Sequence, residues 1–167
     1  IDGLPGLDLV AVTVGPGAFT GLRVGVATAL GFAVAHQCPV VCVSSLEARA
    51  FQAPSPRCLA LLDARKARVY AQLYDTSGAT PDPLSEPVDA PLSDVLPGGS
   101  FLATGEGALI DTELIKEAGG IIDEDAGRSP ALAVAQLGQL RSNQAVEPNE
   151  VALAYLRDAD AKKPVRS

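Results

Sequence analysis

Three glycines, Gly15, Gly17 and Gly21, lie between an apolar run and a long stretch of helix-forming residues. Glycines in such a turn can let a pyrophosphate approach the free N–H groups at a helix N-terminus, as in dinucleotide-binding proteins. The rest of that motif is missing. Pro16 removes one N–H, Thr20 stands at the sixth position, where the G-x-G-x-x-G motif has its last glycine, and no acidic residue ends the next apolar run. There is no glycine–lysine pair of a Walker A loop either. We therefore expect no bound cofactor at this turn.

Three other groups could carry chemistry. Asp63 and Arg65 place a carboxylate beside a cation, but an aspartate that bonds its own turn next to an exposed arginine is the commoner arrangement. Residues 105–108, GEGA, resemble the turn at which actin-like ATPases hold adenosine, although two glycines around a turn occur in many folds. The single histidine, His36, has no serine, cysteine or acid nearby in sequence that indicates a triad. We expect no catalytic residue.

Composition sets further bounds. The 167 residues are 47% hydrophobic, carry a net charge of −7 and are only 4% aromatic, so this chain alone is a poor candidate for gripping nucleic acid. Cys38, Cys42 and Cys58 lie in or beside apolar runs without C-x-x-C spacing. We expect buried, reduced thiols in a cytoplasmic protein and, with one histidine available, no metal site. The longest apolar stretch fits a globular strand–helix–strand unit better than a membrane span.

The predicted elements begin with a βαβ unit. Its parts are a strand at 9–14, a helix that starts after Thr20 and runs from 21 to about 35, and a strand at 40–43. Residues 44–47, SSLE, have the form of a capping box and predict a short helix that ends near Gln52. The two prolines within residues 53–56 then predict a domain boundary.

From residue 57 the predicted order is β-β-β-α-β-α-β-α, the order of a ribonuclease-H-like unit. Its third strand is expected at 84–88, and its last helix at 129–142 with Ser129 as the N-cap. The βαβ unit and its short helix match the second half of the same pattern. We therefore predict an α/β protein of two tandem ribonuclease-H-like units, the first incomplete. The domains are expected at 1–53 (the remaining half of the first unit), 57–144 (the second unit) and 145–167 (a C-terminal tail whose end is mobile).

The helix predicted at 21–36 has almost no polar face. One side is expected to carry Leu22, Val26, Leu30, Ala33 and Val34, and the other Val24, Thr28, Gly31, Phe32 and Ala35. A helix that covers a sheet in a monomer normally shows charged residues on its outer side. A second layer of this chain or a partner protein is therefore expected to cover this helix.

These residues resemble a known family, the bacterial tRNA threonylcarbamoyladenosine biosynthesis protein TsaB, also called YeaZ. The resemblance rests on VGPGAFTGLRVG at 14–25, VSSL at 43–46, DAR at 63–65 with VY at 69–70, and YLR at 155–157. It implies two ribonuclease-H-like units of the actin-like ATPase (ASKHA) fold, and a further N-terminal β-β-β-α segment that this sequence lacks. Two positions depart from the family pattern: Leu30 stands where a lysine is expected, and Ala154 where a proline is expected.

The resemblance implies a non-catalytic subunit that pairs with the catalytic TsaD subunit and recruits the small ATPase TsaE. Together these proteins transfer a threonylcarbamoyl group to an adenosine of tRNA, so tRNA would be reached only through the complex. Without its partner the chain is expected to form a homodimer through the same helix. The expected partner-binding residues are Arg23, Val24, Ala27, Thr28, Gly31, Phe32 and Ala35.

An alternative function is an enzyme in its own right, either an actin-like ATPase or kinase, or a metallopeptidase. It would require a phosphate loop and a metal-binding acid or histidine outside this sequence. Magnesium-dependent ATP binding would distinguish that enzyme from a scaffold subunit.

Overall fold

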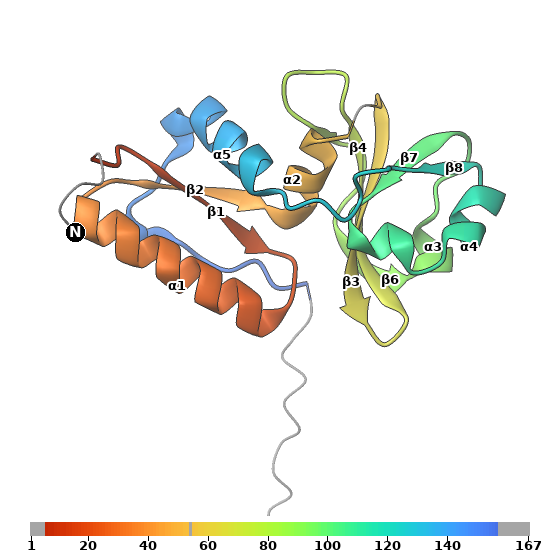
Figure 1. Ribbon diagram of the computed structural model, residues 1–167, viewed down its shortest axis with the longest axis horizontal. Coiled ribbons are helices and arrows are strands. Elements are labelled where there is room, and N and C mark those ends of the chain that lie inside the picture. Colours follow the sequence, from red (N-terminus) through yellow and green to blue (C-terminus); the bar gives the residue numbers. More distant parts are fainter. Residues whose placement is uncertain (1–5, 54, 157–167) are drawn as a thin grey trace, which may run out of the picture.

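The computed structural model describes residues 6–53 and 55–156, which form two α/β units side by side (Figure 1). The N-terminal unit holds a parallel pair of strands, β1 (Val10–Gly15) and β2 (Val40–Ser44), in which Val10 lies opposite Val40 and Thr13 opposite Val43. The crossover between them is α1 (Phe19–His36), and β2 leads directly into α2 (Ser45–Phe51). The predicted βαβ unit is therefore present.

The C-terminal unit is built on one mixed sheet. Its central strand β3 (Arg57–Arg65) pairs antiparallel with β4 (Arg68–Asp75) and parallel with β7 (Phe101–Thr104). This arrangement of an antiparallel hairpin beside parallel strands is the ribonuclease-H-like order predicted from the sequence. The other elements are β5 (Asp82–Pro83) and β6 (Val88–Pro91) on β4, β8 (Gly120–Ile122) on β7, α3 (Leu92–Val95), the 3-10 helix η1 (Glu106–Leu109) and α4 (Thr112–Glu117).

The chain then returns to the N-terminal unit. Helix α5 (Ala131–Leu140) packs on the face of the β1–β2 sheet opposite α1, as Figure 1 shows. Ala133, Val134 and Leu137 of α5 are buried together with Val41 and Val43 of β2. The prediction that residues 129–142 close the second unit is therefore wrong, because the periodicity of an apolar helix does not say which sheet it covers. The helix begins after Pro130, which takes the N-cap position expected for Ser129.

The predicted C-terminal tail also contributes to the N-terminal unit. After the 3-10 helices η2 (Ser142–Gln144) and η3 (Pro148–Glu150), Val146 exchanges both main-chain hydrogen bonds with Val40 of β2. Val151 and Leu153 pack against the cluster that holds α1 on the sheet, and the N–H of Ala154 donates to the carbonyl of Val14. Arg157 and the expected mobile end at 157–167 lie outside the described residues.

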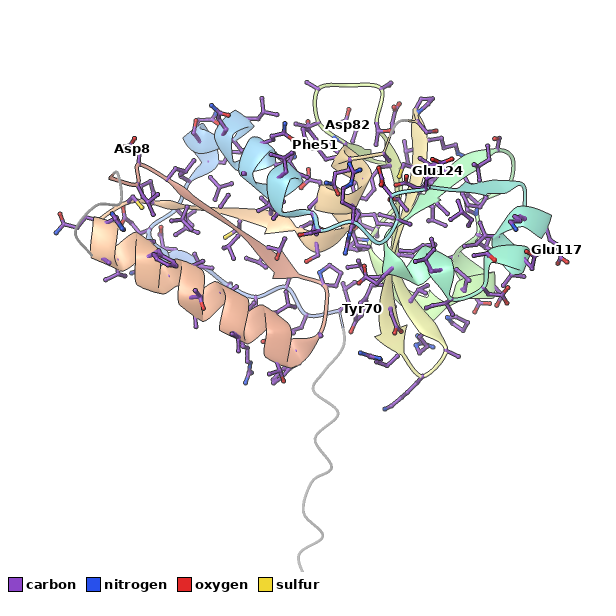
Figure 2. The ribbon with its side chains drawn as sticks, in the orientation of Figure 1. Asp8, Phe51, Tyr70, Asp82, Glu117 and Glu124 are labelled. Atoms are coloured by element: carbon purple, nitrogen blue, oxygen red, sulfur yellow. The ribbon has the colours of Figure 1, made fainter. Side chains whose placement is uncertain are left out.

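Helix α2 connects the two units. Its buried Leu46 and Ala50 pack against Cys58 and Ala60 of β3 and against Tyr74 of β4. Tyr70 of β4, labelled in Figure 2, packs against the same cluster, whereas Phe51 at the end of α2 packs against the cluster under α5. Half of the predicted capping box is present: the Ser44 hydroxyl accepts from the N–H of Glu47, whereas the Glu47 carboxylate pairs with Arg141. Most of the third strand expected at 84–88 is not a strand, since β5 ends at Pro83 and β6 begins at Val88. Pro83 and Pro87 lack the N–H needed for a continuous ladder.

Candidate functional site

Helix α1 is attached to the sheet by a narrow face. Only Val26 and Ala33 are fully buried, and Leu22, Ala29 and Leu30 are half-buried. Val34, grouped in the sequence with Leu22, Val26, Leu30 and Ala33, is 65% exposed because a sheet of two strands is too narrow to cover that flank of the helix. The side chains along the free edge of α1 point away from the rest of the molecule (Figure 2).

The opposite side of α1 is the candidate site. All seven residues predicted to bind a partner are exposed, and the large apolar side chains among them, Val24 and Phe32, are 62% and 42% exposed. Apart from Tyr155, which contacts Arg23 at its edge, none of the other described residues covers this side of the helix. We call it the docking face; its residues are Arg23, Val24, Ala27, Thr28, Gly31, Phe32 and Ala35.

Contacts within the described chain do not require glycine at two positions of α1, Gly25 and Gly31. A Cβ atom built on Gly25 or Gly31 would meet no atom within 4 Å apart from the helix's own backbone. Glycine in a helix interior is less favourable than alanine by about 1 kcal/mol. Gly31 lies on the docking face and Gly25 beside it, so their small size leaves room for a closely packed neighbour.

Arg23, at the edge of the docking face, is held by two aromatic residues. Its Nε donates a hydrogen bond to the Tyr155 hydroxyl at 3.1 Å, and its Cζ lies 3.7 Å from the centre of the Phe19 ring. The two rings are 5.5 Å apart and inclined by 32°. Helix α1 starts at Phe19, with Ala18 rather than Thr20 at the N-cap, so Phe19 and Arg23 are neighbours four residues apart on one helix face.

This Phe19–Arg23–Tyr155 cluster was not predicted. Arg23 and Tyr155 belong to separate motifs of the sequence, and no pattern in either motif indicates that residues so distant in sequence meet. The i, i+4 spacing of Phe19 and Arg23 could have suggested the stacked pair, had the helix been expected to begin two residues earlier.

The glycine turn before α1 is filled by the chain itself. Gly15 has φ +126°, and a Cβ there would collide with the carbonyl oxygen of Ala154. The N–H of Ala154 donates to Val14 at 2.8 Å, a bond that the proline expected at position 154 could not make. The glycine therefore serves the crossing of the C-terminal segment, which lies beside the turn where a phosphate would have to approach.

The second glycine turn has a similar explanation. A Cβ on Gly105 would collide with the carbonyl oxygen of Leu61, and one on Gly107 would lie 2.8 Å from the carbonyl carbon of the same residue. Both glycines let η1 pack directly on the backbone of β3. At the β3–β4 hairpin, Asp63 accepts from the N–H of Arg65 at 2.7 Å, which is the turn aspartate that the sequence favoured.

Two ion pairs involving α2 lie at the junction of the units. Arg49 pairs with Glu106 of η1 at 2.8 Å and also donates to the carbonyl of Arg128. Glu47, only 8% exposed, forms a two-pronged pair with Arg141, which raises the pKa of that arginine. These contacts tie α2 to η1 in one direction and to the end of α5 in the other.

In residues 6–53 and 55–156 no three His, Cys, Asp or Glu side chains are grouped so that they could hold a metal ion. His36 is half-buried at the last turn of α1. Burial raises the pKa of the Cys58 thiol to about 12, with Asp123 adding to the effect, and burial also raises the pKa of Cys42.

By length and composition α1 could cross a membrane, and it is the one helix among the described residues with that property. Its contacts with β1 and with the C-terminal segment place it instead within the βαβ unit. Helices that lie in a membrane surface typically carry many Lys or Arg residues on the polar face, whereas Arg23 is the single Lys or Arg of α1.

The two units, one with a β-β-β-α-β-α-β order and one with the matching βαβ half, define an α/β protein of the actin-like ATPase class with ribonuclease-H-like units. A family model described as TsaD, tRNA N6-adenosine threonylcarbamoyltransferase, matches residues 3–119. The chain belongs to this family, within which it is a TsaB (YeaZ)-like protein. The resemblance and the fold class predicted from the sequence are confirmed.

Comparison with solved structures supports that placement. The chain superposes on YeaZ from Pseudomonas aeruginosa with a TM-score of 0.74 and 26% identity, over 90% of this chain and 74% of that one. A second structure, described as an uncharacterized protein with similarity to peptidase YEAZ from Pseudomonas aeruginosa, gives the same TM-score and coverage at 25% identity.

Comparison with curated sequences gives mycobacterial relatives. The chain is 35% identical over 159 residues to uncharacterized proteins of Mycobacterium bovis and Mycobacterium tuberculosis, covering 93% of this chain and 67% of each relative. It is equally similar to an uncharacterized protein of Mycobacterium leprae, of which it covers 40%.

Proposed function

We propose that the chain is a non-catalytic scaffold subunit of the tRNA threonylcarbamoyladenosine (t6A) machinery. It pairs with a TsaD-like catalytic subunit through the docking face of α1 and recruits a TsaE-like ATPase, and it reaches tRNA only through that complex in the cytoplasm. The same face joins two copies of the chain when the partner is absent. Membership of the family supports the assignment to t6A synthesis.

One observation supports the proposed pairing with a TsaD-like subunit. The docking face is a long apolar helix surface with Val24 and Phe32 exposed, which no described residue covers. Large exposed apolar patches are typical of protein interaction sites. The two glycines with open space beside them also favour a helix partner, since small residues let two helices approach closely.

The turns that resembled phosphate and adenosine sites favour a scaffold over an ATPase. Backbone of the chain itself lies against Gly15, and against Gly105 and Gly107. These glycines therefore need no nucleotide to explain them. The alternative, an ATPase, kinase or metallopeptidase, predicts tight magnesium-dependent ATP binding or metal binding by the intact protein alone, which isothermal titration calorimetry measures directly.

Co-purification with the TsaD-like subunit of the same organism tests the proposed pairing. Phe32→Glu would bury a charge in the interface and should weaken association by a few kcal/mol while leaving the folded subunit intact. Leu132→Glu is the matched control, because Leu132 is an exposed leucine, 67% accessible, on α5 at the other side of the sheet. If Phe32→Glu and the control co-purified equally with the partner, the docking face would be assigned wrongly.

A further inference from the structure

Arg23 combines a firm position with unused hydrogen-bonding capacity. Phe19 covers one face of its guanidinium, and Tyr155 accepts from Nε, so the side chain is fixed in direction. An arginine carries five N–H donors in a planar fork, of which this arrangement uses one. Among residues 6–53 and 55–156 no carboxylate pairs with Arg23, although the chain as a whole is acidic. The fork is therefore available at the edge of an apolar face.

Such a group selects its partner by charge. A guanidinium that meets a carboxylate in two parallel hydrogen bonds gives a directional, charge-assisted contact. At the edge of an interface such a pair fixes register and partner choice. Stacking on Phe19 and the bond to Tyr155 hold the fork before binding, which lowers the entropy lost when a carboxylate docks.

We propose that Arg23 binds a carboxylate on the docking helix of the TsaD-like partner, with Phe19 and Tyr155 as positioning residues. This inference rests on the proposed function and gives the chemistry of one contact in that interface. The acid belongs to a protein helix, because the adjoining docking face is apolar and the chain's net charge of −7 repels nucleic acid.

A second copy of the chain is the competing occupant. Helix α1 contains no acidic residue, so two α1 helices packed together offer Arg23 no carboxylate from the helix itself. The exposed Glu147 precedes η3 and the exposed Glu150 ends it, beside the C-terminal end of α1, and a self-paired chain could bring them to Arg23. Substitutions of these two residues separate the two occupants.

The test measures the dissociation constant between the full-length chain and its TsaD-like subunit by calorimetry at low and high salt. Arg23→Gln should weaken binding by about tenfold and flatten its salt dependence. Arg23→Lys should not restore wild-type affinity, because an ammonium lacks the fork. Arg128→Gln is the matched control, since Arg128 is exposed and paired with Asp125 on the C-terminal unit.

Tyr155→Phe tests the positioning role, because it keeps the ring and removes the acceptor. It should weaken binding about threefold in the wild-type chain and have no further effect in Arg23→Gln, a coupling that a purely structural role for Tyr155 would not produce. Unfolding in urea checks that each variant is folded.

The outcomes separate the two levels of the proposal. If Arg23→Gln binds within twofold of wild type while Phe32→Glu does not bind, the inference about Arg23 is wrong and the docking face stands. If both variants bind normally, the proposed pairing is wrong as well. If Arg23→Gln, Glu147→Gln and Glu150→Gln impair only self-association, Arg23 serves a second copy and the inference is overturned.

Discussion

A Cβ atom on Gly15 would collide with the main-chain carbonyl of Ala154, so the turn that starts α1 and the C-terminal segment are fitted to each other. The same segment donates from Ala154 to Val14 and brings Tyr155 to Arg23. The glycine therefore governs how the C-terminal segment crosses the start of the helix.

Gly15→Ala should destabilise the protein by about 2 kcal/mol or more. The substitution forces alanine into φ +126° and displaces the segment at Ala154. Urea unfolding monitored by circular dichroism measures the change. Gly17→Ala is the control, because a Cβ there would meet Leu22 at an ordinary 3.6 Å. Equal stability of the two variants would show that the segment at Ala154 can move aside without lowering the free energy of unfolding.

Gly25→Ala and Gly31→Ala should each stabilise the isolated chain and weaken its complex. Alanine has the higher helix propensity, and neither new methyl group meets a neighbour within 4 Å, so a gain of up to about 1 kcal/mol is expected. In a closely packed interface the same methyl group holds the partner helix away. Thermal unfolding and the dissociation constant for the TsaD-like subunit provide the two measurements. Unchanged affinity would mean that the partner does not approach α1 closely at these positions.

Removing one member of the Glu47–Arg141 pair should cost about 2 kcal/mol, because the remaining charged group loses two charge-assisted hydrogen bonds in a mostly buried place. Glu47→Leu is the single substitution, and Glu47→Leu with Arg141→Met is the paired one. The pair of apolar residues should recover most of the lost stability in urea unfolding. A double variant as unstable as the single one would mean that the ion pair itself is needed.

Cys58 should be nearly inert toward thiol reagents in the folded protein. Its pKa is raised from 9.0 to about 12, so at pH 8 the thiolate fraction is about 1,000-fold lower than in the unfolded chain. Labelling with Ellman's reagent in a Cys38→Ala, Cys42→Ala background, with and without denaturant, compares the labelling rates of the folded and the unfolded chain. Rapid labelling under native conditions would contradict the burial of this thiol.

The same raised pKa makes stability depend on alkaline pH. The folded state favours the protonated thiol, so the contribution of Cys58 is complete below pH 9 and is lost between pH 9 and about 12, at up to about 1.4 kcal/mol per pH unit. Burial also raises the pKa of Tyr74, which acts in the same direction. Urea unfolding as a function of pH should show a shallower decline for Cys58→Ala than for the wild-type chain.

Local patterns predicted the elements better than their partners. The strand–glycine–helix pattern predicted the βαβ unit. The spacing of apolar residues grouped Val24, Thr28, Gly31, Phe32 and Ala35 on one side of α1, and the structure shows that this side is exposed. These features depend on neighbours in the chain, which the sequence displays directly. Whether a partner binds those residues stays a prediction.

The misassigned parts depend on contacts between distant residues. The sequence of α5 shows an apolar helix but carries no mark of the sheet it covers, and Gly138 is small because α5 passes close to Ala11 of β1. Arg23 and Tyr155 meet only because the C-terminal segment returns to the start of α1. For the same reason the unit expected at 57–144 included α5, which packs on β1 and β2 of the N-terminal unit. Pro54, part of the predicted break, lies outside the described residues.

The return of α5 and residues 145–156 to the N-terminal unit has a consequence for synthesis on the ribosome. The N-terminal unit is completed by a segment that is made after the C-terminal unit, since Ala133, Leu137, Val146 and Leu153 all pack on β1, β2 or α1. The strands of the C-terminal unit all come from one stretch of the sequence, residues 57–122, so this unit can form while the chain is still being extended. Until translation passes residue 156, both faces of the β1–β2 sheet lack part of their cover, so apolar surface of the nascent N-terminal unit stays exposed.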